Sequence, residues 1–477
     1  MTFSGLFFVL VFLPVFLIIY LLAKTVRARN AVLLIFSIIF YASAGIGYLV
    51  LIIALSFFGW YTGARIWMEK NDEKRKKAYL VCGVVLLIAA LGFFKYTGFV
   101  ERTINDITGV GLPVLKIALP LGISFYTFKI ISYLVDVCRG TVPAENSFRR
   151  FLIYTMSFHH VMQGPIVRYG DIRPQLRQRR LTRSDFADGL FRFVVGLGKK
   201  VILADYCGSQ ADVLLPTSSA ISSQPVLSLW IGSVFFTLQM YLDFSAYTDM
   251  ALGIGRMCGF TYMENFNYPY TAKSITDFWR RWHISLSQFF RDYVYIPMGG
   301  SRVAPLRHVF NLLVVWFLTG LWHGSSWNFI LWGLYYFVFV GIEHAFRKKA
   351  GNPGIGRSIL GHIYALLVVN FGWVLFRYTD FTQLGAAIKG MFAGSTFADQ
   401  QIIYTLRSNV YFLIVAVIAC TPLFKCIDNK MSAAADKGSA AEFTVTIVKT
   451  VFAAAIFIWS LFAMAGNTYT PFLYNQF

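Results

Sequence analysis

His323 lies in a polar stretch between two strongly apolar runs. The stretch "TGLWHGSSWNFILWG" (319–333) holds this histidine together with three glycines and two serines, and apolar residues fill 309–318 and 329–340. Lipid offers no partner to polar groups, so interrupted backbone at membrane depth is tolerated only where protein or a water-filled cavity satisfies it. Because desolvation disfavours the charged imidazole, a neutral histidine on the wall of such a cavity is suited to general-base chemistry. A structural histidine hydrogen-bonded across helices is the alternative.

His283 lies in a second unusual segment, "SITDFWRRWHISLSQFFRDYVYIPMGG" (274–300). The segment has helical periodicity but is too highly charged to span lipid, so we expect a helix at the interface or one that dips into a protein-lined cavity. His283 follows Trp279 by four residues, which predicts that the two share one helical face. Arg280 and Arg281 beside them suit an anionic group such as a nucleotide phosphate. Anchoring at the cytoplasmic interface is the alternative for these arginines.

Other polar residues are candidates for the cavity wall. Trp322, Trp327 and Asn328 adjoin His323, and His159 and His160 precede "GPIVRY" in what we expect to be a re-entrant turn. The remaining histidines lie at predicted helix ends and are expected at the interface; they are His308, His344 and His362. HExxH and CxxC spacings are absent, so no metal site is predicted. The glycine pairs in "GLGKK" and "GIGRMCG" are better explained by helix packing than by phosphate binding.

The elements that must position these residues are membrane helices. The 477 residues are 57% hydrophobic and only 14% charged, against roughly 25% charged in soluble domains. Apolar runs of helical length recur along the whole chain. In a membrane protein, the net charge of +20 indicates basic cytoplasmic loops rather than nucleic-acid binding. The six cysteines have no spacing that implies a disulfide framework or a metal site.

Counting the apolar runs predicts an all-α polytopic membrane protein with about 11 membrane-embedded helices, or roughly 9–13. The N-terminal run is expected to be a retained helix rather than a cleaved signal. Helical hairpins are predicted between the basic clusters, the last of them over 308–346 with its tip outside. Residues 1–477 are expected to form one integral-membrane domain, with a small polar cytoplasmic loop over 425–441. The basic clusters that we place on the cytoplasmic side are 24–29, 69–77, 173–183, 301–308 and 347–349.

The motifs around both histidines resemble the signature of the membrane-bound O-acyltransferases, the MBOAT family. Within that family they are most similar to bacterial members that O-acetylate alginate. The resemblance begins with "DFWRRWHISLSQFFRDYVYIPMGG" and "NLLVVWFLTGLWHGSSWNFILWGLY" and covers nearly the whole chain. Further matching segments are 124–140, 164–169, 189–205, 241–260, 264–270, 373–377 and the ending "PFLY".

The resemblance implies a ring of membrane helices around a tunnel. It also implies that His323, in the "WHG" motif, is essential for acyl transfer and that His283 is the second family histidine. Relatives take an acyl group from a cytoplasmic thioester and deliver it across the membrane, where a partner protein often completes the transfer. One departure is "FHHVMQ" at 158–163, where many relatives carry an apolar "FFP". This departure affects the expected tunnel lining and the choice of partner or acceptor.

These observations predict an O-acetyltransferase subunit of the bacterial cell membrane. Its donor would be acetyl-CoA, with no permanently bound cofactor, and its acceptor an extracytoplasmic polysaccharide reached with a secreted acetyltransferase or polysaccharide-processing partner. His323 would deprotonate the acceptor hydroxyl, His283 would orient or polarise the reacting groups, and Trp279, Arg280 and Arg281 would bind the donor. Alternatives within the family are D-alanyl transfer to teichoic acid and O-acetylation of peptidoglycan. A transporter or flippase is the alternative from another class. It should carry paired intramembrane carboxylates or an internal repeat, and the sequence offers neither, only Asp243 and Asp249 near an apolar run.

Overall fold

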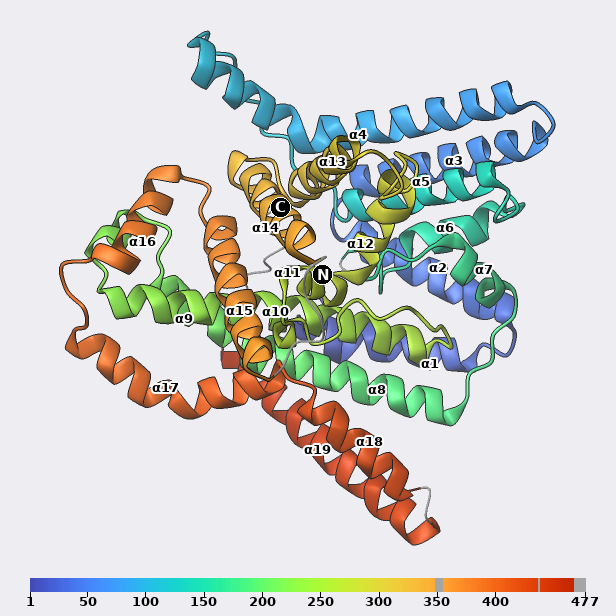
Figure 1. Cartoon of the computed structure of the whole chain (residues 1–477). Coiled ribbons are helices and arrows are strands. Elements are labelled where there is room, and N and C mark those ends of the chain that lie inside the picture. Colours follow the sequence, from blue (N-terminus) through green and yellow to red (C-terminus); the bar gives the residue numbers. More distant parts are fainter. Residues whose placement is uncertain (163, 348–354, 436–437, 467–477) are drawn as a thin grey trace. The chain divides into compact units, whose positions relative to one another are not determined.

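The structure is a computed structural model that describes the chain except for residues 163, 348–354, 436–437 and 467–477. Its described residues form helices and connecting segments without a β-strand (Figure 1). Seven helices in this part are long and apolar enough to cross a membrane. They are α3 (Ile46–Met68), α4 (Glu73–Thr108), α10 (Val226–Met257), α14 (Trp327–Arg347), α15 (Ile355–Arg377), α17 (Gln400–Ala419) and α19 (Ser439–Gly466). The prediction of an all-α, multi-span membrane protein is confirmed.

The other predicted runs form shorter or more polar helices. The N-terminal run is a π-helical turn followed by α1 (Leu13–Leu22), and only residues 151–156 of the run at 151–163 are helical, as the end of α6 (Phe148–Met156). Predicted runs also form α2 (Val26–Ala42), α5 (Ile123–Arg139), α8 (Arg183–Gly198) and α13 (Pro305–His323). Further short helices are α7 (Tyr169–Arg177), α9 (Asp205–Leu214) and α16 (Phe381–Ala393).

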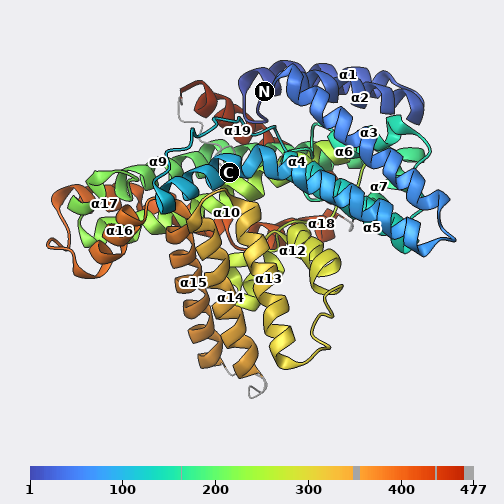
Figure 2. The same cartoon turned by 90° about the horizontal axis from the view of Figure 1, so that it is seen from above.

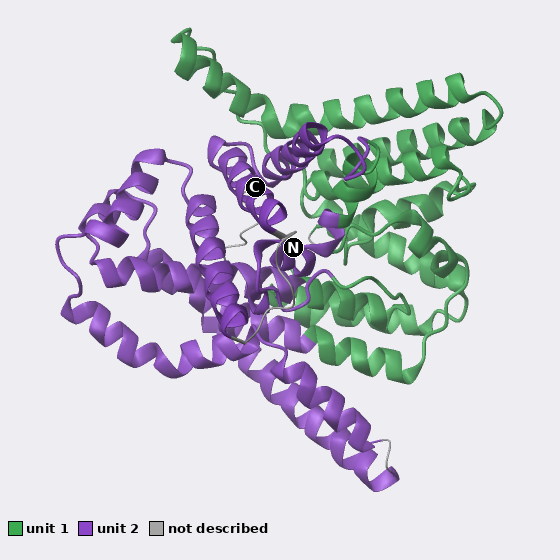
Figure 3. Ribbon diagram, in the orientation of Figure 1, with its two compact units in different colours: residues 1–193, 248–264, 288–297 green, residues 194–247, 265–287, 298–477 purple. Residues whose placement is uncertain are grey.

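The chain divides into two compact units whose segments alternate along the sequence (Figure 3). Unit 1 comprises residues 1–193, 248–264 and 288–297, and unit 2 comprises 194–247, 265–287 and 298–477. Helices α8 and α10 each begin in one unit and end in the other. The units are therefore not successive domains along the chain, and the single integral-membrane domain stays a prediction.

In unit 1, α3 and α5 pack closely because glycines remove side chains from their contact. A Cβ at Gly63 of α3 would lie 2.4 Å from the ring of Tyr133, and one at Gly59 would lie 2.2 Å from the side chain of Ile130. Small residues let helix backbones approach in this way in membranes. α4 lies beside the same pair in both views (Figures 1 and 2). The hairpins predicted on either side of the 69–77 basic cluster, α2–α3 and α4–α5, are confirmed.

In unit 2, α13 and α14 form the hairpin that was predicted over 308–346 (Figure 2). α13 begins with Pro305, whose fixed φ suits a first helical position, and ends at His323 before an extended Gly324. Residues 324–326 turn the chain, and α14 begins at Trp327. The helix is thus interrupted directly after His323, as the glycines and serines predict.

Residues 425–435 of the predicted polar loop are helical instead. They belong to α18 (Leu423–Ala435), which pairs with α19 (Figure 1). Apolar side chains at Leu423, Ile427 and Met431 repeat every four residues, which is helical spacing. Their periodicity outweighs the polar residues between them, and the loop prediction was wrong over this part.

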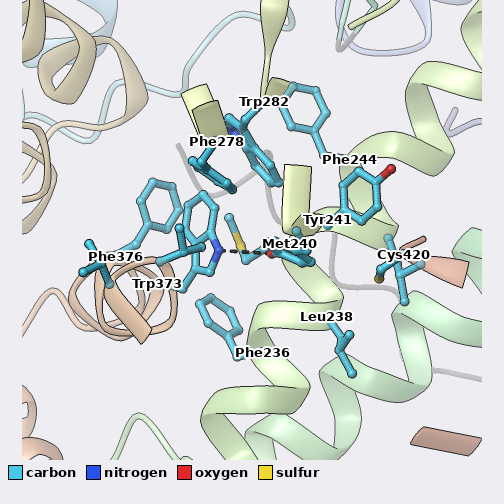
Figure 4. Packing of buried hydrophobic residues seen from close by; sticks show 14 of the residues in the cluster. Phe236, Leu238, Met240, Tyr241, Phe244, Phe278, Trp282, Trp373, Phe376 and Cys420 are labelled. Carbon is cyan, nitrogen blue, oxygen red and sulfur yellow. Dashed lines mark hydrogen bonds between the residues drawn. The ribbon is translucent and has the colours of Figure 1, made fainter. Parts of the chain in front are cut away.

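The core of unit 2 is rich in aromatic rings. Phe278 and Trp282 pack against Trp373 and Phe376 of α15, with Tyr241 and Phe244 of α10 on their other side (Figure 4). Trp282 is 1% exposed and its ring centroid lies 4.9 Å from that of Trp373. Rings of this size bury much apolar area and fix the backbone that carries them.

Candidate active site

The segment that carries His283 is not one continuous helix. α11 (Ile275–Arg281) ends two residues before His283, and α12 (Ile284–Phe290) begins directly after it. His283 has φ +43°, in the left-handed region that side chains other than glycine rarely adopt. The prediction that His283 and Trp279 share a helical face was wrong, because the helix breaks between them.

Residues 265–267 take the place of the missing helical turn. Asn267 N–H donates to the carbonyl of Arg281 at 2.9 Å, and Ile284 N–H donates to the carbonyl of Asn265 at 2.9 Å. The buried Trp282 ring packs on Phe266 at 5.1 Å between centroids and holds the break in place. Strained backbone of this kind persists only where the surroundings determine it, and it is frequent at active sites.

Asn265 is the hydrogen-bonding centre of the break. Its side-chain oxygen Oδ1 accepts from Ser285 N–H at 3.1 Å and from Ser285 Oγ at 2.8 Å, and it lies 3.2 Å from His283 Nδ1. A backbone N–H can only donate, so the atom facing Ser285 is the amide oxygen. His283 Nδ1 must therefore carry a proton, and Nε2 is then the nitrogen with the open lone pair in the neutral ring.

His323 lies close to His283 in an aromatic surround. The two imidazole centroids are 6.5 Å apart, and both residues are buried at 3% and 0% exposure. Trp322 packs edge-on against both rings, at 4.9 Å from His323 and 5.6 Å from His283. Trp332 and Phe376 complete the wall around His323 at 4.8 and 5.7 Å. The structure thus brings together the two histidines that the sequence singles out 40 residues apart.

Backbone contacts fix the position of His323. A Cβ at Gly333 of α14 would lie 2.3 Å from the carbonyl oxygen of Trp316, and one at Gly324 would lie 2.1 Å from the Phe329 ring. Asn328, which is fully buried, donates from Nδ2 to the carbonyl of Phe376 at 3.0 Å. The cavity-lining candidate Asn328 therefore anchors the end of α15, whose Phe376 ring packs against His323.

Trp327 differs from the other candidates around His323. It is 47% exposed at the start of α14, whereas Trp322 is 5% exposed. Trp327 therefore does not belong to the buried aromatic residues around His323. Its neighbour in sequence, Asn328, is buried near them instead.

The three donor-binding candidates have different surroundings. Trp279 is packed among Trp316, Trp332 and Tyr336, with centroids 4.9–5.5 Å away. Arg281 Nε pairs with Asp277 at 2.9 Å. Arg280 is exposed and makes no ion pair with another described residue. Arg280 therefore has the guanidinium that is most open to an anionic ligand.

α11 itself is held by a carboxylate. Glu343 of α14 accepts hydrogen bonds from Ile275 N–H at 2.5 Å and from Thr276 N–H at 2.8 Å. These are among the backbone donors that the first turn of a helix leaves unpaired. A negative charge at this end also suits the helix dipole. Glu343 thereby fixes the helix that leads to Arg280 and His283.

His159 and His160 lie in unit 1, in a buried turn that joins α6 to α7. His159 Nε2 lies 2.6 Å from the Tyr262 hydroxyl, and His160 Nδ1 lies 2.5 Å from the ammonium nitrogen of Lys129. All three basic side chains are fully buried. The expected non-helical turn is present, but these histidines are not placed relative to His323, which belongs to unit 2. Their role in a cavity stays a prediction.

Burial controls the charge of His283, which lies between α11 and α12. Removal from water disfavours the imidazolium and lowers the pKa of His283 to about 3. The ring is therefore neutral at physiological pH. A neutral Nδ1–H imidazole can accept a hydrogen bond or a proton at Nε2.

Sequence reasoning missed two sets of polar residues. Asn265 lies in "ENFNYPY", a matching segment to which we assigned no role, and only its contact with His283 reveals one. Lys200 is buried between Asp205 at 2.7 Å and Asp243 at 2.8 Å. The contact of Asp243 with this lysine was not predicted, because Lys200 and Asp205 precede Asp243 by about 40 residues. Among the described residues, no three histidine, cysteine or acidic side chains gather as metal ligands.

The fold and the buried histidine pair define a polytopic helical membrane enzyme. A family model described as MBOAT, membrane-bound O-acyltransferase family, matches residues 121–384, which include both histidines. The chain belongs to this family and is an acyltransferase.

Curated relatives support the same assignment. The chain is 36% identical to the probable alginate O-acetylase AlgI of Azotobacter vinelandii, over 100% of both chains. It is 32% identical to the peptidoglycan O-acetyltransferase of Helicobacter pylori, over 80% of this chain and 78% of the relative. The teichoic acid D-alanyltransferase of Bacillus subtilis is 29% identical over 55% of this chain and 69% of the relative.

Proposed function

We propose that the protein is a cell-membrane O-acetyltransferase subunit that takes acetyl groups from acetyl-CoA and passes them to the hydroxyl groups of an extracytoplasmic polysaccharide. The observation that carries this proposal is the buried pair of His283 and His323. Full-length similarity to a probable alginate O-acetylase supports acetyl as the group and a polysaccharide as the acceptor. A secreted acetyltransferase or polysaccharide-processing protein is the proposed partner, and the bacterial inner membrane is the proposed location.

The proposed reaction is transfer of an acyl group from sulfur to oxygen. The acceptor oxygen attacks the thioester carbonyl, the new C–O bond forms, and the C–S bond breaks. His323 takes the hydroxyl proton and returns it to the leaving thiolate, so that the products are an ester and the free thiol of CoA. The 6.5 Å between the two imidazole centroids lets both rings reach the reacting groups of one ligand, with the single hydroxyl proton donated to His323 and His283 in contact with a neighbouring group.

His283 is proposed to orient or polarise the reacting groups beside His323. Arg280 and Arg281 are proposed to bind the phosphates of the donor, with the open guanidinium of Arg280 as the stronger candidate. Trp279 is proposed to support this donor site from the aromatic core. The tunnel that would join the cytoplasmic donor to the outer acceptor stays part of the proposal.

Incubation of the purified chain in lipid nanodiscs with acetyl-CoA and candidate polysaccharides tests the function. The expected result is release of free CoA thiol together with ester-linked acetyl on one polymer, with neither product formed by His323→Gln. Loss of acetyl groups from the same polymer in a deletion strain should accompany it. Acetyl only on peptidoglycan would replace the proposed acceptor by that family alternative. Transfer to teichoic acid from a D-alanyl thioester, supplied in a parallel incubation that shows no transfer from acetyl-CoA, would replace both the group and the acceptor.

A further inference from the structure

We propose that Asn265 is a positioning residue that holds His283 in its Nδ1–H tautomer, so that Nε2 accepts a hydrogen bond from an O–H or N–H group of the bound ligand. The inference rests on the proposed function for the nature of this ligand but not for the tautomer. The inference narrows the role of His283. An imidazole in general can either orient the reacting groups or polarise them, and the tautomer decides between these roles. Polarising a carbonyl requires an N–H aimed at it, and the tautomer in this structure has none at Nε2.

The assignment of the tautomer follows from a fixed donor. Ser285 N–H lies 3.1 Å from Asn265 Oδ1 and identifies that atom as the oxygen of the amide. The same oxygen lies 3.2 Å from His283 Nδ1, where two acceptors would repel each other. The proton of the neutral ring is therefore on Nδ1. Backbone pairing of Asn265 with Ile284, at 2.9 Å, prevents the amide from moving away.

At the opposite edge of the ring, the Nε2 atom of His283 lacks a hydrogen-bond partner among the described residues. The whole side chain is fully buried. A buried polar atom without a partner is unfavourable by about 1–3 kcal/mol, and natural proteins retain few of them outside functional sites. The left-handed backbone at φ +43° is a second unfavourable feature at the same residue. A ligand donor at Nε2 would satisfy the buried nitrogen, and the left-handed backbone fixes the position of the ring for it.

Aromatic side chains border the ring of His283. Phe244 packs edge-on against His283 at 4.9 Å and Trp322 does so at 5.6 Å, so the ring is held between apolar faces. The ring of His323 is 6.5 Å away between centroids, so a ligand group bound at one histidine lies within reach of the other. Asn265 thus orients a ring that faces the reacting groups without contacting them itself.

Magic-angle-spinning NMR on the full chain in lipid bilayers, labelled with ¹³C,¹⁵N-histidine, tests the tautomer without any activity assay. The chain has seven histidines, and the His283 signal is assigned by its loss in His283→Gln. At pH 7 we expect a protonated Nδ1 and an unprotonated Nε2. In Asn265→Leu, which removes the acceptor, this preference should disappear. A wild-type signal with protonated Nε2 would overturn the inference, whatever the activity of the enzyme.

Kinetics in nanodiscs then separate positioning from folding. Asn265→Leu should lower kcat by about ten- to a hundredfold, as loss of the outer partners of metal-bound histidines does, with KM for acetyl-CoA little changed. Asn265→Asp keeps the acceptor but adds a negative charge beside Nδ1, which favours the imidazolium. In the NMR experiment, the His283 ring of this variant should therefore become doubly protonated at a pH at least about one unit higher than in the wild-type protein. Ser285→Ala is the matched control, because Ser285 Oγ contacts the same oxygen at 2.8 Å without holding the ring.

The outcomes distinguish this inference from the proposed function. A wild-type NMR titration of the His283 ring in Asn265→Asp, or equal losses of kcat in Asn265→Leu and Ser285→Ala, would reduce Asn265 to a structural residue. If NMR shows the predicted tautomer but the protein transfers no acetyl group to any polymer, the positioning role of Asn265 stands and the proposed acetyl transfer is rejected.

Discussion

Gly333 of α14 lies directly against Gly320 of α13. A Cβ built on Gly333 would stand 3.1 Å from the backbone nitrogen of Gly320 and 2.3 Å from the carbonyl oxygen of Trp316. His323 follows Gly320 by three residues on α13 and Trp332 directly precedes Gly333 on α14, and the two rings of this candidate site lie 4.8 Å apart between centroids. The separation of the two helices therefore determines how closely the indole packs on the imidazole.

Gly333→Ala should destabilise the protein and reduce acyl transfer together. Overpacking of a tight contact is unfavourable by about 1–3 kcal/mol, which should appear as a lower Tm in detergent. Gly341→Ala is the matched control on α14, because a Cβ there meets nothing within 4 Å. That control should be neutral or slightly stabilising, since alanine favours helix by about 0.5–1 kcal/mol over glycine. A wild-type Tm for Gly333→Ala would contradict the close contact.

His323→Ala and His323→Gln should abolish acetyl transfer while the protein remains inserted and monodisperse. Loss of a general base lowers the rate by roughly 10²–10⁴-fold, and an amide cannot accept a proton at neutral pH. His283→Ala should be impaired by a similar or smaller factor. The measurements are acetylation of the surface polymer in a complemented deletion strain and the gel-filtration profile of each variant. Wild-type acetylation by His323→Gln would make this residue structural.

Alanine substitutions of the two arginines beside His283 should have different effects. Arg280→Ala should weaken acetyl-CoA binding, since a charge-assisted contact contributes about 1.5–3 kcal/mol. Arg281→Ala should act mainly on stability, because its guanidinium already pairs with Asp277 at 2.9 Å. Arg280→Ala together with Arg281→Ala should harm donor use more than folding. The test is the affinity for acetyl-CoA, measured by calorimetry on purified protein. Unchanged affinity in the double variant would mean that both arginines are membrane anchors only.

The basic clusters at 70–77, 173–183 and 347–349 should face the cytoplasm. Single cysteines at Lys74, Gln178 and Lys348 in a cysteine-free background should resist membrane-impermeant maleimide on intact cells. Lys74 and Gln178 are exposed, so protection there would reflect the membrane rather than burial; Lys348 lies outside the described residues. Arg179 is unsuitable as a probe site because it is buried and donates to the Tyr20 hydroxyl at 2.8 Å. Labelling at two of the three positions would overturn this topology.

Stability should fall with acid, in part through His283. Burial lowers the pKa of His283 to about 3, whereas a histidine in an unfolded chain titrates near about 6.5. The unfolded chain thus binds a proton that the folded chain does not, and the free energy of unfolding falls as pH decreases from about 6.5 towards 3. His283→Gln should reduce the drop in Tm between pH 7.5 and 5, while the same change at the exposed His344 should not. If Tm falls by the same amount in His283→Gln as in the wild-type protein, the folded protein does not hold His283 in its neutral form.

Local sequence was sufficient for the class of protein and for several elements. Apolar runs with charged boundaries predict membrane helices because the bilayer acts on each segment separately. The hairpin around His323 was predictable for the same reason, since two apolar runs and the glycines and serines between them are contiguous in "TGLWHGSSWNFILWG". The family motifs identified both histidines before their positions were known.

Tertiary structure alone decided how these histidines are held. Periodicity predicts one helix through Trp279 and His283, but backbone pairing with residues 265–267 and the packing of Trp282 break it. Local propensity could not reveal this, because the competing hydrogen bonds come from residues about 16 positions away in the chain. The tautomer of His283 likewise depends on Asn265, and one ion pair of Lys200 depends on Asp243 of α10. Such contacts form only when the chain has folded, so sequence patterns name the reactive side chains and packing determines which of their atoms are available.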